Sequence, residues 1–326
     1  MTKVIFVTRK IPEIGIQKLR DKGYEVDVNE SESIPTQDQL LGFLKTKPYD
    51  AVITLLTDKI DSKIFDATPS VKLYANYATG FDNIDVAEAG RRGIMVANAP
   101  AELTSEAVAE HTIALMLALA ARIVESDEYV RKGLYQGWSP MNFIGTDVLG
   151  KTLGIVGAGR IGGRVGKYAR GLGMKIVYTD VARNEKFEAE CGAVYKSSLE
   201  EVLSEADIVS LHVPLFESTR HLMNKESFSK MKPTSFLINT SRGPVVEESA
   251  LEEALKTGVI AGAALDVFEF EPKISDGLIK LQNIILTPHI ASASIEARNQ
   301  MAELAADNVI DFLEGATPRN LVNPMP

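Results

Sequence analysis

The chain has 326 residues, of which 45% are hydrophobic and 24% charged, and this favours a globular protein of two domains. Its formal net charge of −9 disfavours nucleic acid and anionic membrane surfaces as partners. The single cysteine, Cys191, excludes internal disulfides and cysteine-based zinc sites, so we expect no metal and a reducing, cytoplasmic location.

Short apolar strands alternate with amphipathic helices from the first residues onward, a pattern typical of α/β domains with parallel sheets. In the first hundred residues we predict strands at Val4–Val7, Ala51–Thr54, Val71–Tyr74 and Ile94–Ala97. Helices are predicted between them, for example at Ile14–Lys22 and Gln37–Lys45. Together these elements predict a small doubly wound, flavodoxin-like domain.

Two long helices are predicted to connect this domain with a larger one. The first runs from Ser105 to about Tyr129, and the second runs from Ser294 to Leu313. Within the first, the apolar stretch Ile113–Ala121 is too short to span a membrane, so we expect no membrane contact. The tail Leu321–Pro324 is expected to return to the small domain. The small domain would then comprise residues 1–100 and 292–326, with residues 101–291 inserted as the larger domain.

A glycine-rich turn marks the start of the larger domain. The apolar run Leu153–Val156 leads into Gly157, Gly159 and Gly162, which have the G-x-G-x-x-G spacing. In this motif the first glycine makes a tight turn, the second admits a pyrophosphate and the third lets the helix pack on the strand. Asp180 ends the next apolar run about twenty residues later, as expected of a residue that binds the adenosine ribose.

Six predicted strands complete a Rossmann dinucleotide-binding domain: Leu153–Val156, Ile176–Tyr178, Ile208–Leu211, Phe236–Asn239, Ala261–Leu265 and Ile284–Leu286. The charge of Asp180 would repel a 2′-phosphate, so NAD is favoured over NADP. Arg183 follows closely enough to contact a 2′-phosphate, and NADP therefore stays open.

Three charged segments follow strands of this sheet, at the edge where α/β domains bind ligands. Arg242 follows the strand Phe236–Asn239, three carboxylates at 266, 269 and 271 follow the next strand, and His289 follows the last one. Taken singly, each has a structural interpretation: a surface arginine, a solvated acidic loop, and a histidine packed beside a proline. Taken together, they supply what hydride transfer to a 2-keto acid requires.

That reaction needs a cation for the substrate carboxylate and a proton donor for the carbonyl oxygen. Arg242 offers a bidentate guanidinium, and His289 offers a proton near neutral pH. Glu271 would favour the charged form of the imidazole. Of the other histidines, His111 is expected to pack inside an Ala/Leu-rich helix, and His212 to reach the cofactor through its backbone.

Five segments of the chain resemble the D-2-hydroxyacid dehydrogenase family, and within it the glyoxylate and hydroxypyruvate reductases. They are residues 75–85, 157–162, 239–243, 266–272 and 287–289. The resemblance implies that Arg242 binds the substrate, that Glu271 partners the acid, and that His289 donates or accepts the proton. It also implies a homodimer with the helix around residues 105–130 at the interface.

The resemblance further implies which residues contact the ligands, across a cleft that closes on the substrate. Those expected at the substrate are Leu55, Thr79 and Gly80, with Arg242 and His289. Those expected at the cofactor, besides the three glycines and Asp180, are Val108, Arg160, Ile161, His212, Val213, Pro214, Thr240, Ser241 and Asp266.

Two departures from the family pattern leave the substrate open. Thr79 occupies a position often filled by valine in the reductases, and the segment after Glu271-Pro272 lacks the usual second proline. Glyoxylate or hydroxypyruvate is the favoured substrate. D-Lactate dehydrogenase, which the segment Val181–Asn184 resembles, and D-3-phosphoglycerate dehydrogenase are alternatives. A corepressor that senses NAD(H) without catalysis is a further alternative.

Overall fold

The structure is a computed structural model that describes residues 2–323. It divides into two compact units. Unit 1 comprises the residues up to Thr104 and those from Ala293 onward, and unit 2 comprises Ser105–Ser292. From the sequence, the boundaries between the two domains were predicted after residues 100 and 291. The two units are described separately.

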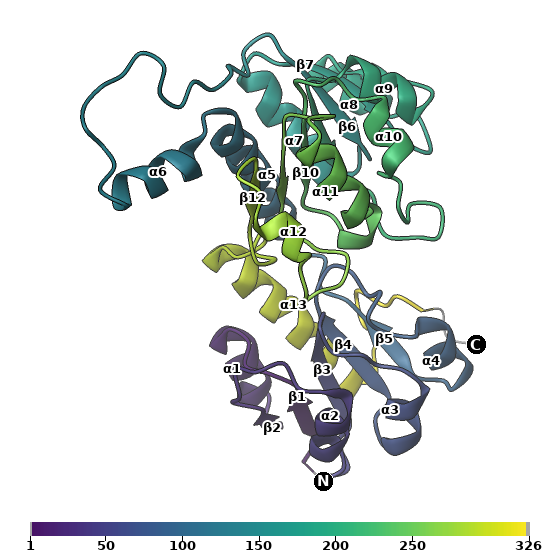
Figure 1. Ribbon diagram of the computed structural model, residues 1–326. Coiled ribbons are helices and arrows are strands. Elements are labelled where there is room, and N and C mark those ends of the chain that lie inside the picture. The colour runs from purple at the N-terminus through teal and green to yellow at the C-terminus, as the bar shows by residue number, and fades with distance from the viewer. Residues whose placement is uncertain (1, 324–326) are drawn as a thin grey trace. The chain divides into compact units, whose positions relative to one another are not determined.

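Unit 1 is a five-stranded parallel sheet with helices on both faces (Figure 1). The strand order is β2-β1-β3-β4-β5, the flavodoxin-like order. The strands are β1 (Val4–Val7), β2 (Glu25–Val28), β3 (Ala51–Leu55), β4 (Leu73–Tyr77) and β5 (Met95–Ala97). The helices are α1 (Glu13–Asp21), α2 (Gln37–Leu44), α3 (Ser62–Ala67), α4 (Val86–Arg91) and α13 (Ile295–Leu313).

Alternate residues of the strands supply the two cores of unit 1. Ile5 and Val7 point into one core, which α1 and α13 cover, whereas Phe6 points into the other, which α2 and α3 cover. Small residues bring α1 and α13 close together, since a Cβ on Gly15 would lie 2.6 Å from the carbonyl oxygen of Ala302.

The end of the described chain pairs with β5, as expected for the tail. The Val322 amide donates to the carbonyl of Val96 at 2.7 Å. The Asn323 side chain bonds the backbone of Val96 and of Ile94, at 2.8 Å each. Pro324, the last residue of the predicted tail, lies outside the described residues.

Unit 2 is a seven-stranded parallel sheet in the order β12-β11-β10-β9-β6-β7-β8, which confirms the Rossmann domain and adds one edge strand. The strands are β6 (Thr152–Val156), β7 (Lys175–Thr179), β8 (Val194–Tyr195), β9 (Ile208–Leu211), β10 (Phe236–Asn239), β11 (Gly262–Leu265) and β12 (Ile284–Leu286). The helices are α5 (Glu102–Ala120), α6 (Ile123–Arg131), α7 (Arg160–Gly171), α8 (Glu185–Cys191), α9 (Leu199–Glu205), α10 (Lys225–Ser229), α11 (Glu248–Lys256) and α12 (Asp276–Ile279), with a 3₁₀ turn, η1, at Gly243–Val245.

The single helix predicted from Ser105 to about Tyr129 is wrong, because the structure has two helices there. Arg122 interrupts the run with a φ of 56°, and its guanidinium bonds Glu125 in the first turn of α6 at 2.5 and 2.9 Å. The sequence around Arg122 contains no glycine or proline that would predict this break. Helix α6 buries none of its residues, and with the loop that follows it stands apart from the sheet (Figure 1).

Helix α5 is long and apolar enough to cross a membrane by length and composition alone. Its most apolar window is 56% buried within the fold, and Leu115 and Met116 belong to a core of unit 2. Core helices pass the same test, so we regard α5 as one of them.

Candidate active site

The glycine turn joins β6 to α7 through close backbone approaches. Gly157 has a φ of 96°, and a Cβ there would lie 2.8 Å from the carbonyl oxygen of His212. A Cβ on Gly162 would lie 2.1 Å from the carbonyl oxygen of Gly157, so only glycine lets α7 start this close to β6. By contrast, a Cβ on Gly159 would meet nothing within 4 Å, which leaves the turn open to a ligand at that point.

A depression of about 540 Å³ lies beside this turn, and the residues present fit the adenosine part of a dinucleotide. Its lining residues are Ala158, Gly159, Asp180, Ala182, Arg183, Asn184 and Glu185. The two oxygens of Asp180 accept hydrogen bonds from the amides of Ala158 and Val181, both at 2.7 Å. A carboxylate has further lone pairs, so Asp180 is held in place and can still accept ribose hydroxyls. Arg160 and Ile161 open α7 beside the turn.

His212, Val213 and Pro214 follow β9 at the same edge of the sheet. The His212 amide donates to the carbonyl of Val156 at 2.8 Å, and its Nε2 lies 2.9 Å from the Ser210 hydroxyl. Burial lowers the pKa of His212 to about 3, so its ring is neutral at working pH. This histidine therefore supports the turn and does not act as an acid.

Thr240 and Ser241 follow β10, where hydroxyl groups connect this loop to α5. The Thr240 hydroxyl lies 2.8 Å from that of Thr112, which also donates to the carbonyl of Val108 at 2.7 Å. Ser241 donates through its amide and its hydroxyl to the side chain of Asn239, at 3.0 and 2.8 Å. Val108 and Thr240, two of the expected cofactor contacts, are thus held near each other.

Arg242, Glu271 and His289 follow three strands that are neighbours in the sheet, β10, β11 and β12. His289 Nδ1 lies 3.0 Å from Glu271 Oε2, while Glu271 Oε1 accepts the Phe268 amide at 3.0 Å. Burial alone would raise the pKa of Glu271. The hydrogen bond and charge of His289, the Phe268 amide and the charge of Arg242 outweigh burial and hold that pKa below its ordinary value.

His289 sits in a strained backbone conformation, with a φ of 57°. The loop around His289 is held by hydrogen bonds to Asp266, whose side chain is fully buried. Its carboxylate accepts the Thr287 hydroxyl at 2.6 Å and the amides of Ile290 and Ala291 at 2.9 and 2.8 Å. The resemblance implies this carboxylate on the nicotinamide side. In the structure it positions the histidine loop.

The acidic segment after β11 is not a solvated loop. Glu248 and Glu269 exchange hydrogen bonds, since the Glu269 amide donates to Glu248 Oε1 at 2.7 Å and the Glu248 amide donates to Glu269 Oε2 at 3.0 Å. His221 Nε2 lies 2.6 Å from Glu269 Oε1. These contacts fix the backbone between Asp266 and Glu271. They were not predictable from the sequence, because the partners lie far apart in the chain.

In unit 1, Leu55, Thr79 and Gly80 lie at the carboxyl ends of β3 and β4. The side chain of Asn76 donates to the carbonyl of Gly80 at 2.9 Å, and that of Asn98 donates to the carbonyl of Thr79 at 2.7 Å. The loop after β4 is therefore held in place at one edge of the unit 1 sheet.

A glycine turn shaped for a dinucleotide, with a carboxylate-paired histidine and an arginine on the same sheet edge, defines a nicotinamide-dependent oxidoreductase. Comparison with known proteins agrees. Residues 113–291 match the family description "D-isomer specific 2-hydroxyacid dehydrogenase, NAD binding domain". A relative named glyoxylate reductase, from Korarchaeum cryptofilum, is 50% identical over 321 residues, covering 98% of this chain and 95% of its own.

Solved structures agree as well. The D-lactate dehydrogenase of Aquifex aeolicus, complexed with NAD and lactic acid, is 31% identical with a TM-score of 0.85, covering 99% of this chain and 100% of its own. The NADPH-dependent glyoxylate/hydroxypyruvate reductase of Sinorhizobium meliloti, complexed with NADP and malonate, is 30% identical with a TM-score of 0.84, covering 99% and 97%. The chain belongs to the D-isomer specific 2-hydroxyacid dehydrogenase family, which confirms the resemblance in its sequence. It is an oxidoreductase acting on the CH–OH group of 2-hydroxy acids.

Proposed function

We propose that this protein reduces small 2-keto acids, glyoxylate or hydroxypyruvate, to the D-2-hydroxy acids with NADH. The observation that carries the proposal is the meeting of Arg242, Glu271 and His289 at the ends of three neighbouring strands. The substrate class follows from the relatives, of which the Korarchaeum protein is named glyoxylate reductase.

Arg242 binds and orients the substrate in this proposal. Its guanidinium is a fixed positive charge with a fork of donors that matches a carboxylate. The backbone at Arg242 is held from both sides, because the Asn239 side chain donates to its carbonyl at 3.0 Å and a Cβ on Gly243 would lie 1.8 Å from the carbonyl oxygen of Phe268. The guanidinium is held as well, because its Nη1 donates to the carbonyl of Ser241 at 2.8 Å.

His289 moves the proton. The dinucleotide, when bound, supplies the two electrons of the reduction as a hydride. The imidazolium donates its Nε2 proton to the carbonyl oxygen as negative charge develops there, while Nδ1–H stays bonded to Glu271. Glu271 fixes the ring orientation and tautomer, and it balances the positive charge before the transfer.

Leu55, Thr79 and Gly80 are proposed to contact the substrate from unit 1. The Thr79 hydroxyl is buried and has no hydrogen-bond partner within the described part of the chain. A buried hydroxyl without a partner suits a substrate that carries its own hydroxyl. Hydroxypyruvate carries such a hydroxyl and the keto form of glyoxylate does not, so Thr79→Val should lower kcat/KM for hydroxypyruvate about tenfold more than for glyoxylate.

NAD is proposed as the physiological cofactor. The carboxylate of Asp180 lies where the adenosine ribose would bind and would repel a 2′-phosphate. The other cofactor contacts are those expected from the sequence. The glycine turn, Arg160 and Ile161 are proposed to bind the pyrophosphate. The segments around Val108, Val213 and Thr240 are proposed to contact the nicotinamide.

A spectrophotometric assay tests the function. NADH loss is followed with glyoxylate, hydroxypyruvate, pyruvate and 3-phosphohydroxypyruvate, and again with NADPH. We expect turnover on the order of 1–1000 s⁻¹ with one of the first two and NADH. Preference for pyruvate would support the D-lactate alternative, and preference for the phosphorylated substrate the phosphoglycerate alternative. NADH binding without any turnover would support the corepressor instead.

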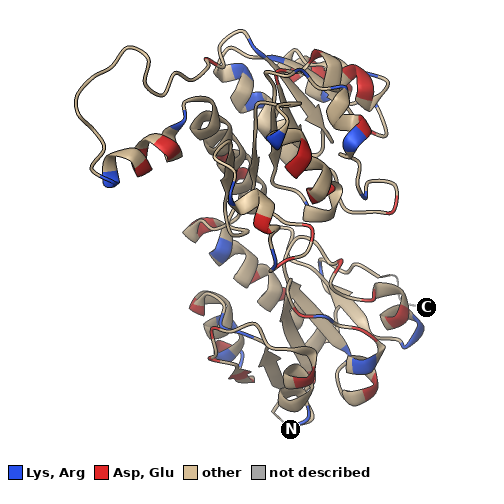
Figure 2. Ribbon diagram, in the orientation of Figure 1, with Lys and Arg blue, Asp and Glu red and all other residues tan. Residues whose placement is uncertain are grey.

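A homodimer is proposed because the segment around α6 exposes apolar side chains. Ile123, Val124, Val130, Leu134, Tyr135, Trp138, Met141, Ile144 and Leu149 are each between 49% and 85% exposed. Charged residues also lie along α6 (Figure 2), and they pair locally, Asp127 with Arg131 and Glu128 with Lys132. An uncovered apolar patch of this size marks a protein interface.

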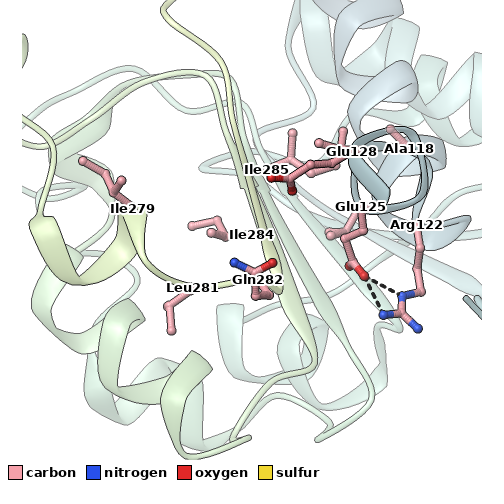
Figure 3. A pocket seen from close by; sticks show the side chains of 11 residues that line it. Ala118, Arg122, Glu125, Glu128, Ile279, Leu281, Gln282, Ile284 and Ile285 are labelled. Atoms are coloured by element: carbon pink, nitrogen blue, oxygen red, sulfur yellow. Dashed lines mark hydrogen bonds and ion pairs between the residues drawn. The ribbon is translucent and has the colours of Figure 1, made fainter. Parts of the chain in front are cut away.

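A second copy of the chain is the occupant we propose for this surface. A cavity of about 230 Å³ lies between the end of α5, the start of α6 and the edge strand β12 (Figure 3). Both apolar and polar side chains line it, the apolar ones including Leu119, Val124, Leu281 and Ile284 and the polar ones being Arg122, Glu125, Glu128 and Gln282. Trp138→Ser should increase the monomer fraction in light scattering coupled to size exclusion. A monomeric native protein at micromolar concentration would contradict the dimer.

A cytoplasmic location is proposed from the thiol chemistry. Cys191 is buried and unpaired at the end of α8, and burial raises the pKa of its thiol. A chain that has one buried thiol and no disulfide needs no oxidising compartment.

A further inference from the structure

The loop after β7 carries a cation at the adenosine side of the cofactor depression. Among the described residues that line the depression, Arg183 is the only one with a positively charged side chain, and Asp180 and Glu185 carry negative charge. An arginine here is the kind of residue that accommodates a 2′-phosphate in NADP-binding domains. The two charged neighbours of the ribose site, Asp180 and Arg183, thus favour opposite cofactors.

The structure resolves this conflict with a third residue. Glu188, on α8, takes the guanidinium of Arg183 in a bidentate ion pair, with Nε and Nη2 each 2.7 Å from a different carboxylate oxygen. One of the two forked edges of the guanidinium, Nε with Nη2, is therefore occupied by Glu188.

Glu188 is itself held in place from the other side. The Tyr178 hydroxyl donates to its Oε1 at 2.8 Å and accepts the Asn184 amide at 2.7 Å. Tyr178 is fully buried, and its ring packs edge-on against Phe187 at 5.1 Å. The side chain of Glu188 is only 17% exposed, whereas that of Arg183 is 61% exposed. The carboxylate is thus the more buried and more firmly bonded partner, and it sets the position of the exposed guanidinium.

The charge of Glu188 is permanent at working pH. Its hydrogen bonds with Arg183 and with Tyr178 lower the pKa of this carboxyl to about 2. The ion pair with Glu188 also raises the pKa of Arg183. Neither partner changes its charge in the range where the enzyme would be assayed, so the pair persists there.

We propose that Glu188 is a determinant of cofactor specificity, because it holds Arg183 in an ion pair and so withholds that cation from a 2′-phosphate. The inference rests on the proposed function, since it concerns how the same site chooses between NADH and NADPH. Glu188 acts through Arg183 and does not itself contact the cofactor.

A 2′-phosphate would have to compete with a preformed partner. At the Nε–Nη2 edge it would have to displace a carboxylate that already makes two charge-assisted hydrogen bonds. At the other edge it would meet a guanidinium whose positive charge Glu188 already balances. Asp180 rejects the 2′-phosphate by direct repulsion, whereas Glu188 removes the attraction that Arg183 would otherwise provide. Two separate residues therefore favour the unphosphorylated ribose.

Equilibrium binding of NADH and NADPH to the full-length protein, without substrate, tests the proposal. The quantity compared is the ratio of the two dissociation constants, by isothermal titration calorimetry. The informative variant is Glu188→Gln, which keeps the shape and an acceptor for Tyr178 but removes the charge. Glu185→Gln is the control, because it removes an equal charge from the same helix, at a residue that lines the depression, without removing the bidentate partner of Arg183.

Glu188→Gln should improve NADPH binding relative to NADH by about tenfold. Glu185→Gln should change the ratio by less than about threefold. In the double variant Arg183→Ala/Glu188→Gln the gain should disappear, because no guanidinium is left to release. Equal effects of the two single variants, or a gain that survives in the double variant, would overturn the proposal.

If Glu188→Gln does not fold, the NADPH affinity of the single variant Arg183→Ala still tests the proposal. With Arg183 already engaged, its removal should leave NADPH affinity within about twofold of the wild type. A large loss of NADPH affinity would mean that Arg183 already serves the phosphate, and it would overturn the inference. Failure of the wild type to bind NADH would instead overturn the proposed function. Normal NADH binding with an unchanged ratio in Glu188→Gln refutes only the inference.

Discussion

The glycine turn after β6 and the loops after β10, β11 and β12 serve one site but are built in different ways. The turn is built from backbone contacts. Side chains are excluded at Gly162 and Gly157, because a Cβ there would lie 2.1 and 2.8 Å from a carbonyl oxygen. The loops act through side chains, and each side chain depends on distant support. His289 depends on Asp266 and Glu271, from which it is separated by 23 and 18 residues (289 − 266 and 289 − 271). A short motif therefore defines the turn, whereas only the assembled sheet defines the loops.

The largest effect should come from the proton donor, which belongs to the loops alone. His289→Gln removes the titratable group and keeps a similar size, so kcat should fall by about a thousandfold. The dissociation constant for NADH should stay within about threefold, because the turn is untouched. Steady-state kinetics and NADH titration measure the two quantities on the same sample. Near-normal turnover in this variant would refute the assigned role.

The opposite result is expected for the turn. Gly162→Ala places a Cβ against the carbonyl of Gly157, so α7 must shift away from β6. NADH affinity should fall by about a hundredfold, and unfolding free energy by about 1–3 kcal/mol. Gly163→Ala is the matched control, because a Cβ there meets nothing within 4 Å. It should stabilise α7 by about 0.5–1 kcal/mol and leave NADH binding unchanged. Equal behaviour of the two alanine variants would contradict the backbone account.

A smaller effect should follow from loosening the histidine loop without touching its histidine. Asp266→Asn turns one acceptor oxygen into a donor facing the amides of Ile290 and Ala291 or the Thr287 hydroxyl. We expect about 1–3 kcal/mol lower stability and about tenfold lower kcat. Denaturant unfolding and steady-state kinetics measure these changes. Unaltered kcat would show that the loop does not need this support.

The smallest effect concerns pH. The pKa of Glu271 lies below its ordinary value of 4.5 in the folded protein, so the ionised carboxylate stabilises the fold at pH values above that ordinary pKa. This contribution is lost as the pH falls through the lowered folded-state pKa. The difference in Tm between wild type and Glu271→Gln should therefore be largest near neutral pH and shrink toward about pH 4. A difference that grows on acidification would contradict the sign.

The sequence predicted the parts of the fold that have strong local signals. Apolar runs located most strands, and the glycine spacing located the turn. Strand β2 (Glu25–Val28) was missed because charged residues alternate with its valines at a sheet edge, and β8 has only two residues. The break at Arg122 was missed because its left-handed backbone has no glycine or proline to announce it.

In the site, too, residues with a local sequence signal were predicted and long-range contacts were not. The residues that carry charge at strand ends were predicted because parallel strands bring their carboxyl ends to one edge. Their supports were not predicted. The bonds from Asp266 to the histidine loop, and those between Glu248 and Glu269, join residues whose proximity no local pattern reveals. Glu188 was missed for a related reason, since on sequence alone it is one of three acidic residues on a short helix.

A crystal structure of the enzyme with NADH and oxamate, a non-reactive analogue of a 2-keto acid, tests the central claim most directly. We predict two of the three guanidinium nitrogens of Arg242 at about 3 Å from the oxamate carboxylate or carbonyl, and His289 Nε2 at about 3 Å from the carbonyl oxygen. Glu271 should remain bonded to Nδ1. Oxamate bound elsewhere, or held with His289 turned away from its carbonyl, would contradict the assignment of these three residues.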